Sequence, residues 1–282
     1  MIILDNKKIR LEIAEKGAEI RRCTVNGEER FYDGDPNYWS GISPVLFPIC
    51  SGLKDNIYTL NGKEYTMAKH GFARNMDFEV EEKGNTYAVF LLKSTAETLE
   101  CYPFDFEFRI RYTLNDESIN VKYDIKNLSR DIMYAGVGSH EAYACPEGIE
   151  DYDIIFEKKE TLKAHKFSGS LISRETDTIL YESDTLPLYY KYFDIDAVIL
   201  TDIKSRFVTL RNRKNGKSVS VSFPDFPYLL IWTKPGAPYV CIEPWINCPP
   251  FEDDSSDITA KVGMAAIKPD TTHSLSHTIY FN

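Results

Sequence analysis

The chain has 282 residues, of which 43% are hydrophobic and 27% are charged, values typical of globular proteins that exclude wholesale disorder. Its formal net charge of -10 would repel a phosphate backbone, so we exclude nucleic acid as a partner. No apolar run approaches the roughly 20 residues that span a bilayer, and Asp5 with two lysines follows the start too early for a secretory signal. We therefore expect a cytoplasmic protein without a membrane partner.

Strand-like segments follow one another from the start of the chain to its end. Three Asn-Gly pairs separate such segments, and each pair predicts a type I′ hairpin turn, because this turn needs two successive residues with positive φ. The pairs are Asn26-Gly27, Asn61-Gly62 and Asn215-Gly216. Alternating or continuous β-formers predict strands over residues 8–14, 58–60, 77–82, 87–93, 104–114, 118–127, 197–201, 207–211 and 218–223.

Helical periodicity is confined to short turns near residues 35–39 and 94–97, and the prolines gather in loops. The acidic stretch 252–257 is interpreted as a solvated loop. No repeat or linker divides the sequence. We therefore predict an all-β fold, a large antiparallel β-sandwich, formed by one domain over residues 1–282.

Six cysteines are scattered without a C-x-x-C pair, so we expect reduced and buried thiols. They are Cys23, Cys50, Cys101, Cys145, Cys241 and Cys248.

Two of the five histidines occur where strand-like runs end in glycine-flanked polar stretches. His70 lies in MAKHGFAR and His140 in AGVGSHEAYACP, and such loop positions often present reactive groups. The common hydrolase, zinc-protease and nucleotide-binding motifs are missing from the sequence. The two histidines are therefore the leading candidates for proton-transfer chemistry.

A third candidate lies in a predicted hairpin with strands over residues 228–233 and 239–242, joined by the turn KPGAP. Glu243 is expected where the second strand meets Pro244, at the end of an apolar run. Alternation along the strand predicts that Cys241, Glu243 and Trp245 share one face, so that an acid and an indole could line the same cleft. Glu243 would then be an accessible proton carrier.

Five stretches resemble the aldose 1-epimerase family, specifically its LacX-type branch. In chain order they read PVLFPICSGLKD, KHGFARNMDFEV, VGSHEAYACP, DIDAVIL and FPYLLIWTKPGAPYVCIEPW. The matches run in register from about residue 35 to residue 245, and the flanking β segments are compatible. The resemblance therefore covers essentially the whole chain.

The resemblance implies a β-sandwich of the galactose-mutarotase type that binds a sugar between its loops and uses no metal or cofactor. His70 and His140 correspond to the two catalytic histidines of the family, and Glu243 to its general base. Interconverting anomers requires removal of the proton on O1 and protonation of the ring oxygen. Our hypothesis is that Glu243 is the base, that His140 is the acid, and that His70 orients the opening hemiacetal.

One departure from the family concerns substrate binding. Relatives commonly read G-R-L-K-D where this chain has an SGLKD stretch, so Gly52 replaces an arginine that the family places near the sugar. Lys54 or Arg74 could supply the missing positive charge. Asp225 could accept hydrogen bonds from sugar hydroxyl groups, or it could shape its proline-rich turn. Trp232 could be a platform on which a sugar ring packs, or a core residue.

Three other functions fit the same residues. The protein could be a hexose-6-phosphate 1-epimerase, although Arg74 and Lys54 make a thin phosphate cluster. It could be a non-catalytic carbohydrate-binding or sensing protein of the same fold. A glycoside hydrolase that pairs Asp225 with Glu243 ranks lowest, because it leaves both histidines without a role. In each case the partner is a small-molecule sugar, an aldohexose in the main hypothesis, and the protein is expected to be a monomer or homodimer.

Overall fold

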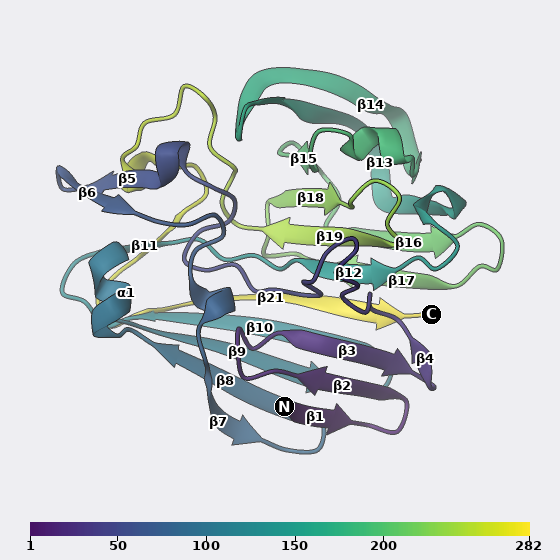
Figure 1. Cartoon of the computed structure of the whole chain (residues 1–282), viewed down its shortest axis with the longest axis horizontal. Coiled ribbons are helices and arrows are strands. Elements are labelled where there is room, and N and C mark those ends of the chain that lie inside the picture. Colours follow the sequence, from purple (N-terminus) through teal and green to yellow (C-terminus); the bar gives the residue numbers. More distant parts are fainter.

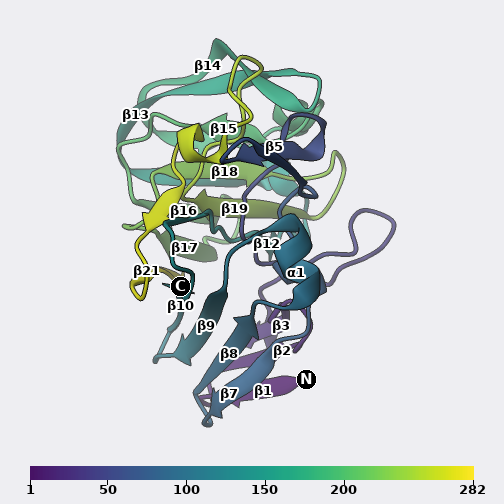
Figure 2. The same ribbon diagram turned by 90° about the vertical axis from the view of Figure 1, so that its left-hand side faces the viewer.

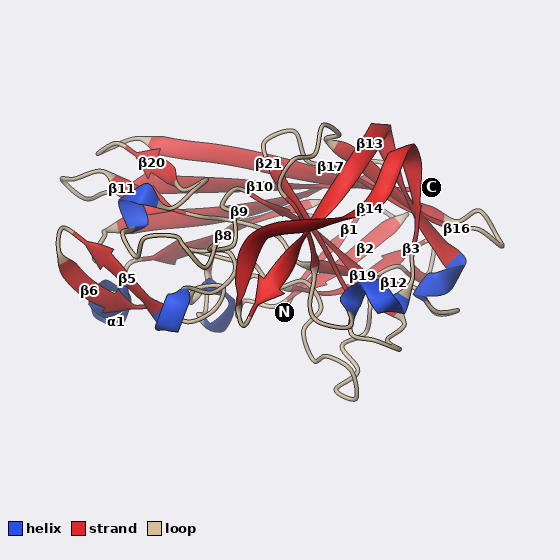
Figure 3. Ribbon diagram, turned by 90° about the horizontal axis from the view of Figure 1, so that it is seen from above, coloured by secondary structure: helices blue, strands red, loops and turns tan.

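The computed structural model describes residues 1–282 and consists almost entirely of strands (Figure 1). Its only α-helix is α1 (Ala96–Cys101), and the helical segments are few and short beside the strands (Figure 3). The predicted all-β fold is confirmed. The strands are β1 (Ile2–Asp5), β2 (Ile9–Ile13), β3 (Ile20–Val25), β4 (Glu28–Glu29), β5 (Ile57–Leu60), β6 (Lys63–Thr66), β7 (Glu79–Lys83), β8 (Tyr87–Lys93), β9 (Phe106–Leu114), β10 (Ser118–Asn127), β11 (Met133–Ala135), β12 (Glu141–Ala144), β13 (Tyr152–Ser168), β14 (Leu171–Pro187), β15 (Val198–Leu200), β16 (Phe207–Asn212), β17 (Ser218–Ser222), β18 (Tyr228–Trp232), β19 (Tyr239–Trp245), β20 (Ala265–Ile267) and β21 (Thr272–Phe281). The 3-10 turns are η1 (Lys54–Asn56), η2 (Ala73–Asn75), η3 (Ile149–Asp151), η4 (Tyr190–Phe193) and η5 (Ile258–Ala260).

Two antiparallel sheets form the body of the molecule. The larger has nine strands in the order β14-β13-β16-β17-β21-β10-β9-β8-β7, and the smaller has four in the order β12-β19-β18-β15. The smaller sheet lies above strands β21 to β7 of the larger one in Figures 1 and 2, and a further sheet of β1 to β4 lies beside strands β7 to β10. Strands β13 and β14, with 17 residues each, form a long hairpin that arches over the small sheet (Figure 1).

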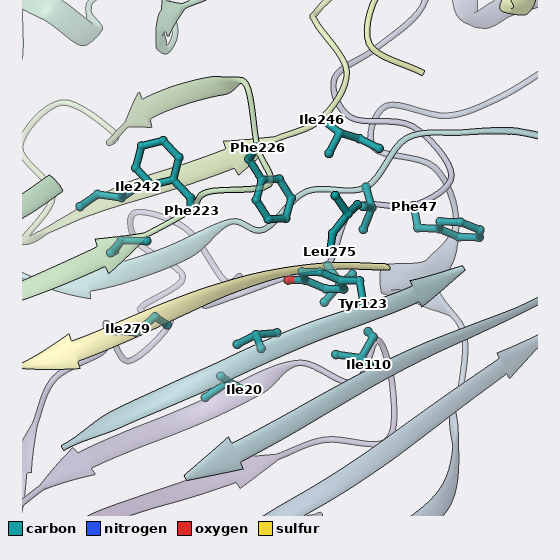
Figure 4. Packing of buried hydrophobic residues seen from close by; sticks show 14 of the residues in the cluster. Ile20, Phe47, Ile110, Tyr123, Phe223, Phe226, Ile242, Ile246, Leu275 and Ile279 are labelled. Carbon is teal, nitrogen blue, oxygen red and sulfur yellow. The ribbon is translucent and has the colours of Figure 1, made fainter. Parts of the chain in front are cut away.

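The core fills the space between the sheets. A cluster of 64 buried hydrophobic residues extends from Leu4 to Phe281. Figure 4 shows Tyr123 of β10 facing Phe226 across this space, with ring centroids 6.3 Å apart. Strand β9 alternates buried and half-buried residues without a break, as expected for a sheet with one covered face. Burial of one face of each sheet therefore holds the layers together.

The sequence patterns located 11 of the 21 strands. Residues 87–93 and 118–127 coincide with β8 and β10, and the other predicted strands overlap observed ones, with ends that shift by up to three residues. The long hairpin of β13 and β14 was not predicted. Its pairing contains four register shifts, and much of β14 is exposed, so its residues do not follow a strict period of two.

The predicted hairpin turns are confirmed at two of three sites. Asn26-Gly27 and Asn61-Gly62 have positive φ at both residues and connect paired strands through two-residue loops. At Asn215-Gly216 the predicted antiparallel hairpin is present between β16 and β17, but the type I′ turn is wrong, because only the glycine has positive φ and the loop is longer. The Asn212 side chain stabilises this loop, because its Oδ1 accepts hydrogen bonds from the backbone N–H groups of Lys214 (2.8 Å) and Asn215 (3.2 Å).

The first predicted helical turn is a hydrogen-bonded turn, and the second coincides with the start of α1. The backbone N–H groups of Tyr38 and Trp39 donate to the Asp35 carbonyl, and Thr95 caps α1 through a reciprocal hydrogen-bond pair with Thr98. None of the helices is long and apolar enough to cross a membrane. All six cysteines are free thiols; five are buried, while Cys101 is half-buried.

The prediction that Glu243 ends its strand is wrong. Strand β19 continues through Pro244, which lies opposite Leu229 of β18. On the other side of β19, pairing with β12 stops at Ile242, so the missing N–H of the proline breaks no bond to β12. Glu243 is therefore held rigidly within a sheet, rather than on a loop.

Candidate active site

The outer face of the small sheet forms the floor of a cavity of about 390 Å³. Along β19 the side chains alternate, so Val240 and Ile242 enter the core while Glu243 and Trp245 line the cavity. The same alternation in β18 turns Leu230 toward the cavity. Loops form the walls, and the tip of the β13–β14 hairpin contributes to the lining. The full lining consists of Trp39, Ser51, Lys69, His70, Arg74, His140, Phe167, Ser170, Ile172, Asp196, Ala197, Ile199, Leu230, Trp232, Glu243, Trp245 and Pro249.

Glu243 is a deeply buried carboxyl group at the floor of the cavity. Its residue is 2% exposed, and no hydrogen bond or ion pair other than its contact with His140 links its side chain to the protein. Burial raises its pKa well above the ordinary value of a glutamic acid, and this effect outweighs the attraction of Lys69. The group therefore holds its proton more tightly than a glutamic acid in water.

His140 lies next to this carboxyl group. Its Nε2 is 3.5 Å from Glu243 Oε2, and its Nδ1 is buried without a hydrogen-bond partner in the protein. The loop before it is fixed to β19, because Trp245 Nε1 donates to the Ser139 carbonyl at 3.1 Å. Gly138 permits this approach, since a Cβ there would lie 2.4 Å from the Trp245 ring. Burial lowers the pKa of His140 to about 3.

His70 also lines the cavity, and its backbone has an unusual conformation. His70 and Gly71 have φ values of 69° and 72°, and a Cβ on the glycine would lie 2.2 Å from the Phe47 carbonyl oxygen. The HG pair therefore bends the chain tightly against residue 47. The Ser51 backbone N–H donates to His70 Nδ1 at 3.1 Å, while Ser51 accepts from the His70 backbone N–H at 2.7 Å.

The hydrogen bond from Ser51 to the ring fixes the tautomer of His70. Because Nδ1 accepts a hydrogen bond, the ring proton is on Nε2 in the neutral imidazole. Burial and the neighbouring His140 lower the pKa of His70 well below its ordinary value. His70 is thus a neutral donor, whereas His140 has no such bond to fix its tautomer.

Aromatic side chains enclose the histidines. The Trp39 ring lies 4.9 Å from the His140 ring and 5.3 Å from that of Trp232, between centroids. Trp245 lies 5.5 Å from the His70 ring. These indoles present flat apolar surfaces of the kind that pack against sugar rings and exclude water from the reacting groups. Trp232 lines the cavity and is partly exposed, so its role as a sugar platform stays a prediction.

Charged groups also line the cavity. Arg74 lies in η2, shortly after His70 in the chain. It is half-buried, and no carboxylate lies within ion-pair distance of its guanidinium. Burial lowers the pKa of its guanidinium, with Glu19 and Glu243 opposing that shift. Lys69 Nζ and Asp196 Oδ2 are 3.8 Å apart and also line the cavity. Arg74 thus has its hydrogen-bond donors available for an oxygen-rich ligand.

Two predicted binding residues lie elsewhere, so their assignment is corrected. Lys54 is exposed on η1 and borders a separate cleft beside Phe251, because left-handed residues at Ser51 and Asp55 redirect the chain. Asp225 is exposed in its proline-rich turn and accepts the backbone N–H of Ser276 at 2.8 Å. Asp225 therefore cannot complete a carboxylate pair with Glu243 in this cavity. Gly52 faces open space, where a Cβ would meet nothing within 4 Å.

The cavity also contains residues that the sequence patterns did not single out. Lys69 adjoins the HGFAR stretch, and Asp196 lies in DIDAVIL, so the matched stretches held a signal for both. Phe167, Ser170 and Ile172 come from the unpredicted β13–β14 hairpin and had no such signal. Below the floor, His277 Nε2 lies 3.0 Å from Glu141 Oε1, joining the two sheets directly behind His140. No motif had marked this buried pair.

One group of donors in the site has the composition of a metal site. His140, Cys241 and Glu243 each offer one ligand atom, and the three atoms lie within 4.8 Å of one another.

Comparison with known proteins finds relatives over the full length of the chain. The aldose 1-epimerase family pattern matches residues 1–253. The chromosomal LacX protein of Lactococcus lactis subsp. lactis is 32% identical over 293 aligned residues, covering 99% of this chain and 98% of that protein.

Two solved structures are similar over the whole chain. A galactose mutarotase related enzyme from Lactobacillus acidophilus matches with a TM-score of 0.95 and 32% identity, covering 100% of this chain and 97% of that one. A galactose mutarotase-like protein from Lactobacillus casei ATCC 334 matches with a TM-score of 0.93 and 28% identity, covering 100% of both chains.

Proposed function

The chain belongs to the aldose 1-epimerase family, and we propose that it interconverts the α and β anomers of a free aldose. The observation that carries the proposal is the buried pair of His140 and Glu243, 3.5 Å apart and facing a cavity with indole walls. Such a pair can exchange protons with two oxygen atoms of one small ligand. A cavity of about 390 Å³ is of the size that small-molecule sites have.

The proposed reaction uses one base and one acid. Glu243 removes the proton from the C1 hydroxyl group while His140 protonates the ring oxygen, so the C1–ring oxygen bond breaks and an aldehyde forms. Rotation about C1–C2 then presents the other face of the aldehyde. The ring closes when His140 takes back its proton and Glu243 returns one to O1. The enzyme ends in its starting state, and no atoms are gained or lost.

The protonation of the pair bears directly on this assignment, because burial opposes the charged forms of Glu243 and His140 that the reaction requires. Burial favours the neutral forms, in which Glu243 carries the proton and His140 does not. A proton transfer between the two residues produces the carboxylate and the imidazolium that the reaction needs, with no change in net charge. The nearby cations Lys69 and Arg74 stabilise the carboxylate form. The pair therefore reaches its reactive state without taking a proton from solvent.

His70 has a different part in this proposal. Its Nε2–H group is fixed as a donor by the Ser51 backbone, so it can hold a sugar oxygen and stabilise negative charge that develops on it. It need not gain or lose a proton during the cycle. His70 thus orients the opening hemiacetal while His140 transfers the proton.

The experiment that tests the proposed function follows anomeric proton signals by NMR after dissolving pure α-anomers. We expect the protein to accelerate equilibration of neutral aldoses such as galactose or glucose, while an equal amount of the Glu243→Gln variant does not. Binding of the sugar without acceleration would contradict catalysis and favour a sensing role. The same assay with 6-phosphates tests a second candidate, hexose-6-phosphate 1-epimerase, which the unpaired Arg74 and the adjacent Lys69 favour.

Arg74→Met should weaken substrate binding more than it slows chemistry. The guanidinium has no carboxylate partner, so its hydrogen bonds are available to the sugar, and a lost charged hydrogen bond is worth about 1.5–3 kcal/mol. We expect KM to rise roughly 10- to 100-fold with a much smaller change in kcat. Steady-state kinetics checks this, with Lys54→Met as the matched control, because Lys54 lies outside the cavity. A lower kcat at unchanged KM would instead place Arg74 in the chemical step.

A further inference from the structure

Cys241 is the one member of the His140, Cys241 and Glu243 group to which the proposed reaction gives no role. It follows Tyr239 and precedes Glu243 on the same face of β19, and its residue is fully buried. Around it lie Tyr32 and Tyr239, with Trp39 and Trp232 packed against them. The thiol thus lies on the same face of the sheet as the proposed base, covered by aromatic side chains at the edge of the cavity.

The three donors suit zinc in type and in spacing. Imidazole and thiolate are ligands that zinc prefers, whereas magnesium and calcium prefer oxygen. Zinc lies about 2.0 Å from nitrogen or oxygen and about 2.3 Å from sulfur, so its tetrahedral ligands are roughly 3.5 Å apart. His140 and Glu243 already have this separation, and all three donor atoms lie within 4.8 Å. Side-chain movements of about 1 Å would complete the set.

A second observation points to a ligand at the same place. The Glu243 side chain is 2% exposed, lines the cavity, and accepts no hydrogen bond from any protein donor, while His140 Nε2 has only its 3.5 Å contact with that carboxyl group. Buried polar groups are normally satisfied. The polar atoms here are thus available to a bound species, and His140 is more than nine-tenths buried.

The charge of the assembled site is also favourable. A divalent cation with one thiolate, one carboxylate and one neutral imidazole has no net charge, which suits a buried position. Binding displaces the thiol proton of Cys241 and any proton on Glu243, and both leave to solvent. The fourth zinc position would face the cavity, where water or a sugar hydroxyl group could occupy it.

We propose that zinc, or a divalent ion of similar ligand preference, binds to His140, Cys241 and Glu243 and thereby inhibits the enzyme. The metal-binding part stands on geometry alone, whereas the inhibitory part rests on the proposed function. A zinc ion on these atoms occupies the carboxyl oxygen and a ring nitrogen of the acid–base pair, so neither can transfer a proton.

Metal binding is tested with Co²⁺ as the probe, because a cobalt–thiolate bond gives a near-ultraviolet absorption band that Zn²⁺ lacks. The full-length protein should develop this band on titration, and Zn²⁺ should abolish it by displacement. Cys241→Ala should lose the band and weaken Zn²⁺ binding in calorimetry by on the order of 100-fold or more. The matched control is Cys23→Ala, which alters an equally buried thiol outside this group. Should Cys241→Ala bind Co²⁺ with the same spectrum as the wild type, the site is overturned.

A second variant tests the ligand set independently, in case Cys241→Ala does not fold. Glu243→Gln keeps the shape of its side chain but removes the negative charge, and it too should bind Zn²⁺ at least about 10-fold more weakly. Unchanged affinity in Glu243→Gln would overturn the three-ligand set.

The inhibitory part is tested with the anomer assay. Zn²⁺ should slow the wild type and Cys23→Ala, a chelator should restore them, and Cys241→Ala should keep its activity in the presence of Zn²⁺. Metal binding with full activity would overturn inhibition and count against the roles of His140 and Glu243. Absence of anomerisation in every metal-free protein would contradict the proposed function, while the Co²⁺ spectra would still decide the metal site.

Discussion

Glu243→Gln is expected to lower kcat for anomer interconversion by about 10²- to 10⁴-fold while the protein still folds. The glutamine amide has nearly the same shape as the carboxylic acid, but it cannot accept the proton from O1. The side chain lies in the middle of β19 and accepts no hydrogen bond from the protein, so the substitution breaks no structural contact of that kind. NMR of the anomeric protons measures the rate, and circular dichroism verifies the fold.

Asp225→Asn is the matched control for this experiment. It makes the same chemical change at an exposed carboxylate outside the cavity, so the rate should stay at the wild-type value. A Glu243→Gln variant with wild-type activity would remove Glu243 from the mechanism. Loss of activity in both variants would point to a shared effect on folding instead.

The same variant should also change how stability depends on pH. The pKa of Glu243 is raised in the folded protein, so its proton is bound more tightly in the folded than in the unfolded state. The free energy of unfolding therefore falls as pH rises from the unfolded value of about 4.5 toward the folded pKa. Glutamine cannot ionise, so Glu243→Gln should lack this fall and exceed the wild type in stability at pH 8 by more than at pH 5.

Urea unfolding at the two pH values measures this difference. Comparing the two proteins isolates Glu243 from His70 and His140, whose lowered pKa values act with the opposite sign below pH 6.5. An identical pH dependence in wild type and variant would show that burial does not hold the proton on Glu243. A gain in stability with a loss of activity is the usual relation for a buried catalytic group.

His140→Gln should reduce kcat by a similar factor, about 10²- to 10⁴-fold, with a small effect on KM. The amide can hold an oxygen atom by a hydrogen bond but cannot deliver a proton to the ring oxygen. Single-substrate kinetics on the α-anomer separates the two parameters. If KM rises and kcat is unchanged, His140 binds the sugar without protonating it.

His70→Gln provides the contrasting control. Because the Ser51 backbone fixes His70 as a donor, a glutamine N–H can replace part of its function. The expected loss is roughly 10-fold, the value of one neutral hydrogen bond. In addition, His140→Ala should regain activity with free imidazole, which can enter the vacated space and carry a proton, whereas His70→Ala should respond much less. Equal rescue of both would contradict the division of roles.

Local sequence information was sufficient for much of the fold. The turns Asn26-Gly27 and Asn61-Gly62 depend only on residues that tolerate positive φ, and the patterns of β8 and β10 reflect alternating burial. The β13–β14 hairpin escaped prediction because its register shifts interrupt that alternation. The Asn215-Gly216 turn escaped because the side chain of Asn212 sets the loop geometry.

Within the cavity, sequence motifs located the proposed proton-transfer residues, but not their surroundings. His70, His140 and Glu243 were marked by glycine neighbours, by an apolar strand and by resemblance to a family, and all three line one cavity. Lys54 appeared equally suitable as a ligand, yet left-handed residues on either side of Gly52 direct it to another cleft. Sequence proximity to a motif gives no side-chain direction.

By itself, the sequence determined the all-β class, 11 of the 21 strands, and the residue types available for proton transfer, because these depend on local periodicity and on chemistry that each residue carries. Only the tertiary structure decided which groups meet. The 3.5 Å contact of His140 with Glu243 joins residues about a hundred positions apart, and the protonation of both is set by burial among Trp39 and Trp232. Burial depends on the packing of many segments at once, so no local pattern encodes it.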